Sequence, residues 1–235
     1  MSSYFFDYNL YKKRLNKKTG LFIPVCIFII ILLMVAICFI YPKSKTVNFY
    51  FVEVGNYMQY SQANSLAQEI QQKNAAGYVH FDGRYHVLTS YYLNLEDAEN
   101  VVNNIKDEYP NANVFTLSIK QAKYANTNKE NKTIKQTIES NEKLIKQLYT
   151  EIIRYDKNEI SKDKFDLSLK RLSSDYSDII DEFSSSFKTN SKMTNAKEKL
   201  TTIKNTIPSS ADSFNLKYCL IKIVITHYSF LDFLS

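Results

Sequence analysis

Residues 21–41 form an apolar stretch of 21 positions without one charged side chain. A helix rises about 1.5 Å per residue, so this stretch is long enough to cross a hydrocarbon core roughly 30 Å thick. Pro24 falls in its first turn, where a missing backbone N–H costs little, and Pro42 directly follows its end. The sequence therefore predicts a transmembrane helix over residues 21–41.

Basic residues gather on the N-terminal side of this stretch. Residues 1–20 contain five Lys and Arg against one acidic residue, whereas only Lys43 and Lys45 follow closely on the other side. An excess of basic residues marks the cytoplasmic end of a membrane helix. We therefore expect a single-pass protein of the cell membrane, with residues 1–20 as a cytoplasmic basic tail and the C-terminal region extracytoplasmic.

A cleaved signal peptide is the alternative to this anchor. Its apolar core would be about 7–15 residues long and would end in a small-x-small cleavage site. The stretch is longer, and its best local candidate, Ala36-Ile37-Cys38, fits such a site poorly. Cys26 and Cys38 lie within the stretch and Cys219 is alone outside it, so we expect neither a disulfide framework nor a metal site.

Charge is unevenly distributed along the rest of the chain. Residues 46–120 carry four basic and eight acidic side chains, a net charge of −4, whereas residues 121–235 carry 19 basic and 15 acidic ones. A protein that binds nucleic acid needs a basic surface to neutralise phosphates. We therefore expect no nucleic-acid partner for residues 46–120.

Strand and helix patterns alternate between residues 46 and 120. Runs of β-branched and aromatic residues indicate strands, and Asp-Gly between two such runs favours a hairpin. In order, we expect a strand over 46–54, a helix over 60–73, strands over 78–81 and 85–88, a helix capped by Asn94, and a strand over 114–119. This order predicts an α+β fold, a split β-α-β-β-α-β domain with a four-stranded antiparallel sheet and two helices on one face.

The two halves of this segment echo each other. Residues 50–57 read Tyr-Phe-Val-Glu-Val-Gly-Asn-Tyr and residues 85–92 read Tyr-His-Val-Leu-Thr-Ser-Tyr-Tyr. The first run resembles the Tyr-x-Val-Gln-Val-Gly-Ser-Phe motif of the SPOR domain, a peptidoglycan-binding module of bacterial division and sporulation proteins. The resemblance covers residues 46–120, a third of the chain. It departs from the family at Glu53, where glutamine is usual, and at Ser90-Tyr91, where Gly-Pro is common.

The resemblance implies that the sheet face without helices, together with adjoining loops, binds glycan strands stripped of their stem peptides. Strand alternation places Tyr50, Val52 and Val54 beneath the helices and the intervening residues on the open face. His80 can join this face, but His80 and His86 lack further ligands for a metal. The glycan-binding residues that we expect are Phe49, Phe51, Glu53, Asn56, Tyr57, Tyr78, His86, Leu88 and Thr116.

Several of these residues have a second interpretation. Phe49, Phe51 and Leu88 could instead dock against the C-terminal helices and form an intramolecular core. Asn56 could close the turn, and Tyr57 could be a packing residue, as aromatic side chains near turns often are. The sequence alone leaves these interpretations open.

The C-terminal half is expected to be helical. Residues 121–133 are polar and predict a linker. Residues 134–235 repeat apolar side chains at steps of three and four, which is typical of a helical bundle or coiled coil that recruits partners or self-associates. A last apolar helix, at about 213–233, is interrupted by three charged residues. It could pack in the bundle, lie on the membrane or cross it.

No catalytic arrangement is evident in the sequence. The three histidines lack a nucleophile partner by motif, and the chain contains no Gly-rich phosphate loop, HExxH pair or GxSxG elbow. We therefore expect a non-enzymatic, membrane-anchored protein without cofactors that binds denuded septal glycan during sporulation or cell division. The alternative is an extracytoplasmic scaffold whose β-α-β-β-α-β domain and helices bind protein partners.

Overall fold

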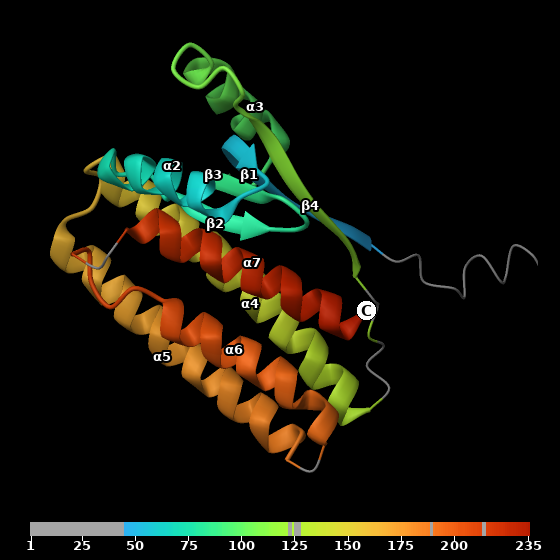
Figure 1. The fold of residues 1–235 in the computed structure, drawn as a ribbon. Coiled ribbons are helices and arrows are strands. Elements are labelled where there is room, and N and C mark those ends of the chain that lie inside the picture. The colour runs from blue at the N-terminus through green and yellow to red at the C-terminus, as the bar shows by residue number, and fades with distance from the viewer. Residues whose placement is uncertain (1–44, 122–123, 125–127, 189, 213–214) are drawn as a thin grey trace, which may run out of the picture. The chain divides into compact units, whose positions relative to one another are not determined.

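The protein is described by a computed structural model over residues 45–121, 124, 128–188, 190–212 and 215–235 (Figure 1). The predicted cytoplasmic tail and the predicted transmembrane helix lie outside the described residues. Among the helices of the described part, none combines the length and the apolar character that a membrane span requires. Ser44–Ser235 form one compact unit.

A four-stranded sheet forms the N-terminal part of this unit. Its strands are β1 (Lys45–Tyr57), β2 (Tyr78–Phe81), β3 (Tyr85–Tyr92) and β4 (Asn113–Gln121). They lie in the order β2-β3-β1-β4, and every neighbouring pair is antiparallel. The predicted α+β class and the four-stranded antiparallel sheet are therefore confirmed, with strand ends that extend a few residues beyond the predicted ones.

Two helices cover one face of the sheet. They are α2 (Tyr60–Gln72) and α3 (Leu95–Ile105), and Val52, Val54 and Val87 are buried beneath them. The side chain of Asn94 caps α3 by accepting a hydrogen bond from the Asp97 backbone N–H at 2.8 Å. The predicted β-α-β-β-α-β order is thus confirmed, with both helices on the same face.

The C-terminal helices form a bundle. They are α4 (Lys129–Asp156), α5 (Lys162–Ser186), α6 (Thr194–Thr206) and α7 (Leu216–Leu234), with a short 3₁₀ turn before α6. The predicted linker was too long at its C-terminal end, because Asn128 accepts a hydrogen bond from the Asn131 backbone N–H and starts α4 there. Eight residues of α7 are buried, so the bundle alternative for the last helix is confirmed.

The bundle covers the second face of the sheet. Figure 1 shows α2 and α3 on one side of the strands and α4–α7 gathered on the other. One apolar core joins sheet and bundle. The Phe49 ring meets His227 and Tyr228 of α7 edge-on at 5.9 and 6.2 Å, and Tyr91 meets Tyr149 of α4 at 6.1 Å. The prediction of an open sheet face was therefore wrong, because α4 and α7 exclude water from it.

A buried polar chain crosses the bundle beside this core. The Tyr176 hydroxyl donates to Asn141 Oδ1 at 2.6 Å, and Asn141 Nδ2 donates to His227 Nδ1 at 3.1 Å. Nε2 of His227 has no hydrogen-bond partner among the described residues. Burial lowers the pKa of His227 to about 3, so the ring is neutral in the folded protein.

Candidate functional site

Three of the predicted ligand residues are core residues. Phe49 is 4% exposed, and Phe51 and Leu88 are fully buried between the sheet and the bundle. Tyr78 is half-buried, with its ring 5.0 Å from that of Tyr218 on α7. In this conformation none of the three core residues can touch a ligand, so the alternative in which they dock against the C-terminal helices is confirmed.

Two further residues lie on the other face of the sheet. Thr116 pairs with Tyr50 across β1 and β4, and directly opposed residues point to the same face. Thr116 is therefore exposed on the side of α2 and α3, and its predicted place on the face without helices was wrong. Tyr57 is half-buried and packs against the apolar cluster that α2 forms with Val54 and Val87 of the sheet, as its packing interpretation predicted.

The remaining predicted residues meet at one end of the sheet. Glu53 and Asn56 of β1 join Asp82, Arg84 and His86 of the β2–β3 hairpin in what we call the hairpin network. Arg84 Nε donates to Asn56 Oδ1 at 2.9 Å, and Asn56 Nδ2 donates to Glu53 Oε1 at 2.8 Å. A buried carboxylate thus fixes an exposed amide, and the amide in turn orients a guanidinium at the surface.

The imidazole of His86 lies between two carboxylates of this network. Its Nδ1 is 3.2 Å from Glu53 Oε2, and its Nε2 is 2.7 Å from Asp82 Oδ1. Ionised carboxylates only accept hydrogen bonds, so both bonds form when the ring carries both protons. The ring of Phe115 of β4 packs against His86, with centroids 4.5 Å apart and planes tilted by 34°, and closes the network on the bundle side.

The turn of the hairpin keeps part of the network at the surface. Gly83 has a φ of +110°, a conformation that suits glycine, and residues 81–84 are all exposed. Glu53 is only 2% exposed, whereas Asn56 and Arg84 are exposed. Burial lowers the pKa of the nearby His80, although the charge of Asp82 opposes this shift. Among the described residues, no group of three or more His, Cys, Asp or Glu side chains could hold a metal ion.

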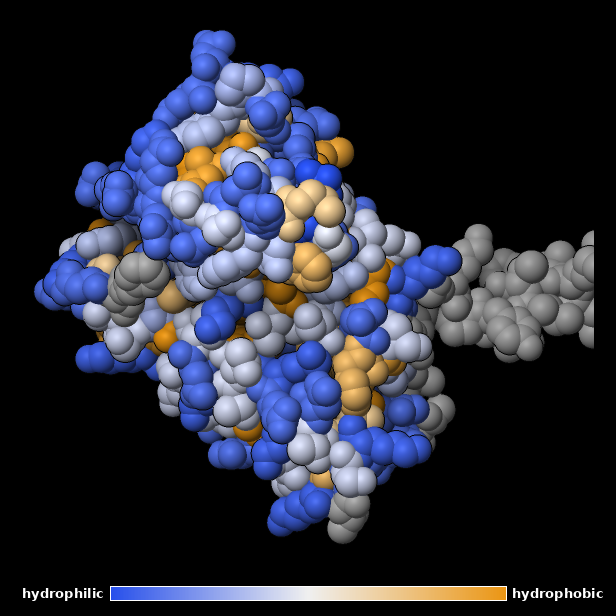
Figure 2. Space-filling model, in the orientation of Figure 1, coloured by the Kyte–Doolittle hydropathy of each residue, from blue (hydrophilic) through white to orange (hydrophobic). Residues whose placement is uncertain are grey.

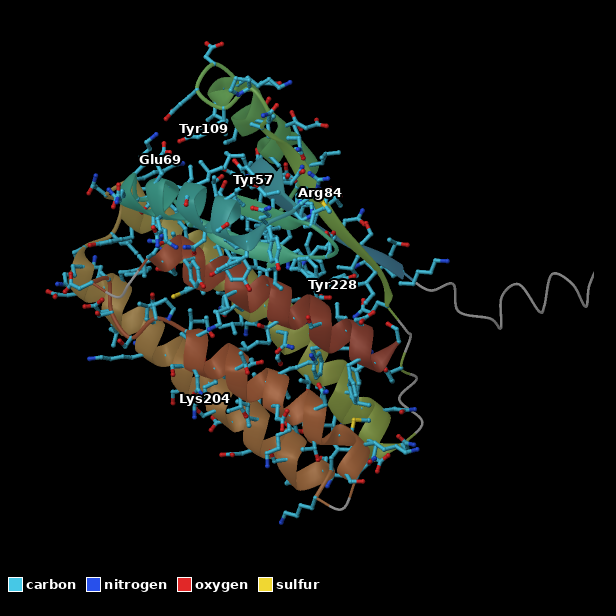
Figure 3. The ribbon with its side chains drawn as sticks, viewed as in Figure 1. Tyr57, Glu69, Arg84, Tyr109, Lys204 and Tyr228 are labelled. Atoms are coloured by element: carbon cyan, nitrogen blue, oxygen red, sulfur yellow. The ribbon has the colours of Figure 1, made fainter. Side chains whose placement is uncertain are left out.

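Three aromatic rings lie in series at the same end of the sheet. The ring of Phe81 is 4.7 Å from that of Tyr85, which is 5.6 Å from that of Tyr60 at the start of α2. Phe81 and Tyr60 are 58% and 56% exposed. We call Tyr60, Phe81 and Tyr85 the aromatic strip. Figure 3 shows Arg84 and Tyr57, the β1 partner of Tyr85, at this end of the sheet.

Sequence reasoning did not identify the aromatic strip or Arg84 as site residues. One signal was present: residues 54–68 contain no Asp, Glu, Lys or Arg, although charged residues make up 23% of the chain. Of the residues in question only Tyr60 lies in this run, so the signal points to the start of α2 and not to the hairpin. Figure 2 shows that the face in view is mainly hydrophilic, with apolar residues confined to small areas.

A groove of about 290 Å³ lies between α2 and α3, and Lys217 of α7 also lines it. Its rim is tied together by Lys73, whose Nζ contacts Glu69 and Glu108 at 2.9 and 2.8 Å and the Tyr109 hydroxyl at 3.0 Å. Hydrogen bonds to Glu108, Tyr109 and Glu69 raise the pKa of Lys73 above its ordinary value. None of the predicted site residues lines this groove.

The comparisons with known proteins give a limited result. No protein-family model matches the chain, and no curated protein matches it either. Among solved structures, the peptidoglycan-binding domain of the Bacillus subtilis cell wall lytic enzyme CwlC is a weak structural neighbour. It is 20% identical, covers 34% of this chain and 99% of its own, and aligns with a TM-score of 0.26. We draw no conclusion about ligand or role from a likeness at this level.

Proposed function

We propose that this chain is a membrane-anchored, non-enzymatic protein that binds denuded glycan strands of peptidoglycan at the septum. The observation that carries the proposal is the hairpin network, which holds hydrogen-bonding groups at the end of the sheet where exposed aromatic rings lie on the opposite face. Sugar rings offer apolar C–H faces to aromatic side chains and hydroxyl groups to amides and charged groups. Saccharide sites therefore combine both kinds of side chain, as other small-ligand sites do.

The sequence motif supports the same proposal. Residues 50–57 resemble the SPOR motif, and the described fold has the strand and helix order that the residue patterns predicted. The proposed contact surface differs from the expected one, because the bundle covers the middle of the sheet face. Binding is instead assigned to the hairpin end, where Asn56 and Arg84 are exposed.

The anchor is the second part of the proposal. The uncharged stretch 21–41 and the basic residues before it support a single span with residues 45–235 outside the cell. An anchored domain is confined to the layer next to the membrane, which raises its effective concentration at the wall. Each individual contact with glycan can then be weak.

Sedimentation with peptidoglycan sacculi tests this function. The full-length protein in detergent is mixed with intact sacculi or with sacculi treated with an amidase that removes stem peptides. We expect more protein in the pellet with the denuded material, and less when Asn56→Ala replaces the wild type. Absence of the folded protein from both pellets would overturn the proposed function.

The scaffold alternative is favoured by one specific observation. The helices of the C-terminal half bury the sheet face that the family resemblance assigned to glycan, and they account for almost half of the described residues. A scaffold would use its helical surface and would ignore wall material. The same sedimentation separates the two functions, because a protein that docks only on proteins stays in the supernatant with both preparations.

A further inference from the structure

The groove between α2 and α3 separates two small apolar clusters. One cluster forms around α2 and includes Val54 and Ile70, and the other forms around α3 and includes Val52. The groove, about 290 Å³ in volume, is lined by Val54 and Ile70 of the first cluster and by Val101, which packs against the second. Protein interiors are close-packed, so a space of this size between two clusters is a place where a ligand can complete the packing.

The floor of the groove lies where the pairing of the sheet is irregular. The β1–β3 register shifts on both sides of Glu53, which leaves Val54 and Thr89 outside the regular residue pairs. Both of these residues line the groove. Bulges of this kind turn side chains away from the regular alternation and are frequent beside active sites.

The wall at Ala75 is fixed without a ligand. The backbone N–H of Ala75 donates to Ile70 O at 3.2 Å, and its carbonyl accepts from Asn215 Nδ2 at 2.6 Å. At the rim, Lys73 after α2 contacts Glu108 after α3 at 2.8 Å, which ties the two helices together. A groove that is already formed loses little conformational freedom when it binds a ligand.

Every charged side chain that lines the groove has a partner of opposite charge (Figure 3). The Nζ of Lys73 contacts two carboxylates, those of Glu69 and Glu108. Lys217 Nζ lies 3.0 Å from Asp156 Oδ2. The hydrogen bond from Lys73 lowers the pKa of Glu108, which therefore stays ionised. A charged ligand would find no unpaired charge of opposite sign along this lining, so the groove favours an uncharged ligand.

The rest of the lining combines apolar side chains with hydroxyl groups. Val101 and Ile105 offer apolar surface, while Ser90, Tyr92 and Tyr109 carry hydroxyls. A purely apolar ligand such as an acyl chain would cover these hydroxyls without giving them a partner. A sugar ring has apolar C–H faces and hydroxyl groups of its own. Small-molecule sites measure about 300–1,000 Å³, so a groove of about 290 Å³ has room for one ring and not for a strand.

We propose that this groove binds one uncharged, N-acetylated sugar ring, such as an N-acetylglucosamine unit of peptidoglycan. The acetamido methyl group contacts Val101 and Ile105, and the sugar hydroxyls bond to Ser90 and Glu108. The choice of an N-acetylated sugar rests on the proposed function. The groove is a separate site, because no member of the hairpin network lines it. Two sites on one anchored protein hold wall material at two points, so each site can be weak.

The test measures the binding of three small probes by saturation-transfer NMR. The full-length protein is placed in nanodiscs of phosphatidylcholine, which carry no sugar, and empty nanodiscs give the background. The probes are N-acetylglucosamine, glucosamine with its amino group protonated, and cyclohexanol, an apolar ring with one hydroxyl group. We expect N-acetylglucosamine to bind with a dissociation constant on the order of 1 mM, and the other two to bind more weakly by about threefold or more.

Three variants locate the site of binding. Ala75→Leu places a larger side chain at the groove wall and should weaken N-acetylglucosamine binding about tenfold or more. Ser90→Ala removes one hydroxyl group and should weaken it about threefold to tenfold, with little effect on cyclohexanol. Ser65→Leu adds the same apolar side chain at an exposed position of α2 outside the groove and should leave all three probes unchanged. Unfolding curves of each variant check that the fold is kept.

The outcomes separate this inference from the proposed function. Variants Ala75→Leu and Ser90→Ala that fold and bind N-acetylglucosamine like the wild type would overturn the inference. Equal binding of all three probes would also overturn it, because the groove would then be an unselective apolar gap. A wild type that sediments with sacculi but gives no N-acetylglucosamine signal would overturn the inference alone. A wild type that binds N-acetylglucosamine but stays out of both sacculus pellets would overturn the proposed function and leave the groove as a sugar site.

Discussion

The middle of the sheet and its hairpin end use the same strands in opposite ways. In the middle, Phe49 and Phe51 of β1 enter a core shared with the bundle. A few residues further along β1, Glu53 and Asn56 enter a hydrogen-bonded network that reaches the surface. The β1–β3 register shifts between Val52 and Glu53 and again between Glu53 and Gly55, so the regular alternation of the middle region is interrupted where the network begins. The middle region is covered by helices, whereas the hairpin end has polar groups and rings at the surface.

The difference is made by residues far away in the sequence. The α7 side chains that cover Phe49 are His227 and Tyr228, about 180 residues further along the chain. Near the hairpin, His86 contacts Glu53, Asp82 and Phe115, which belong to the sheet and its hairpin. Which part of the sheet is accessible to a ligand therefore depends on where the packed helices end, and not on the strand pattern alone.

Two phenylalanines test the contrast most strongly. Phe51→Ala removes a fully buried ring from the core, and we expect it to lower the free energy of unfolding by about 3–5 kcal/mol. Phe81→Ala removes a ring that is 58% exposed, and its effect should stay within about 0.5 kcal/mol. Denaturant unfolding of the full-length protein measures both. Equal losses would mean that the middle of the sheet is not covered as described.

The pH dependence of stability gives a second comparison between the two regions, through one histidine in each. Burial lowers the pKa of His227 to about 3, from an ordinary value of 6.5, so the unfolded chain binds a proton that the folded chain does not. Below pH 6.5, stability should therefore fall with decreasing pH by at most about 1.4 kcal/mol per unit, an effect that ends near pH 3.

The variant His227→Gln removes this titration. Its free energy of unfolding should therefore fall less on acidification than that of the wild type. His80→Gln is the matched change at the hairpin end. Burial lowers the pKa of His80 too, but that side chain is partly exposed and Asp82 opposes the shift. Its replacement should therefore alter the pH dependence less than replacement of His227. The opposite ranking, measured by urea unfolding between pH 7 and 4.5, would contradict the assignment of the two environments.

Two asparagines on β1 give the smallest expected effect. Asn56→Ala breaks the link between Glu53 and Arg84 and should cost about 1 kcal/mol of stability, because Glu53 keeps its contact with His86. Asn48, at the other end of β1, is exposed, and its side chain donates a hydrogen bond to the Tyr50 hydroxyl at the surface, so Asn48→Ala should have almost no effect. Thermal unfolding compares the two, and a larger loss for Asn48→Ala would show that the network does not stabilise the hairpin.

Much of the sheet domain was predictable from local patterns. The Asp82-Gly83 turn, the Asn94 cap and the alternating runs fix strands and helices through interactions within a few residues. The cover by α7 was not predictable in this way, because alternation tells which side chains share a face and not what lies over that face. Thr116 was assigned to the wrong face for a related reason, since only the register of β4 against β1 pairs it with Tyr50.

The candidate site was predicted in part. Glu53, Asn56 and His86 were named, but each as a separate ligand residue rather than as members of one network. Arg84 and Asp82 were visible only as turn residues, because the bond from Arg84 to Asn56 joins positions 28 residues apart. The aromatic strip likewise depends on the approach of Tyr60 to the hairpin, which no local pattern specifies.

Hydrogen exchange of the full-length protein with and without denuded glycan strands tests the central claim most directly. If glycan binds at the hairpin end while the bundle stays in place, protection should increase over residues 54–62 and 78–86. Exchange in α7 should remain unchanged, because its contacts with Phe49 persist. Faster exchange in α7 together with new protection over residues 47–51 and 115–119 would mean that the bundle moves aside and that glycan binds the middle of the sheet, which would contradict this account.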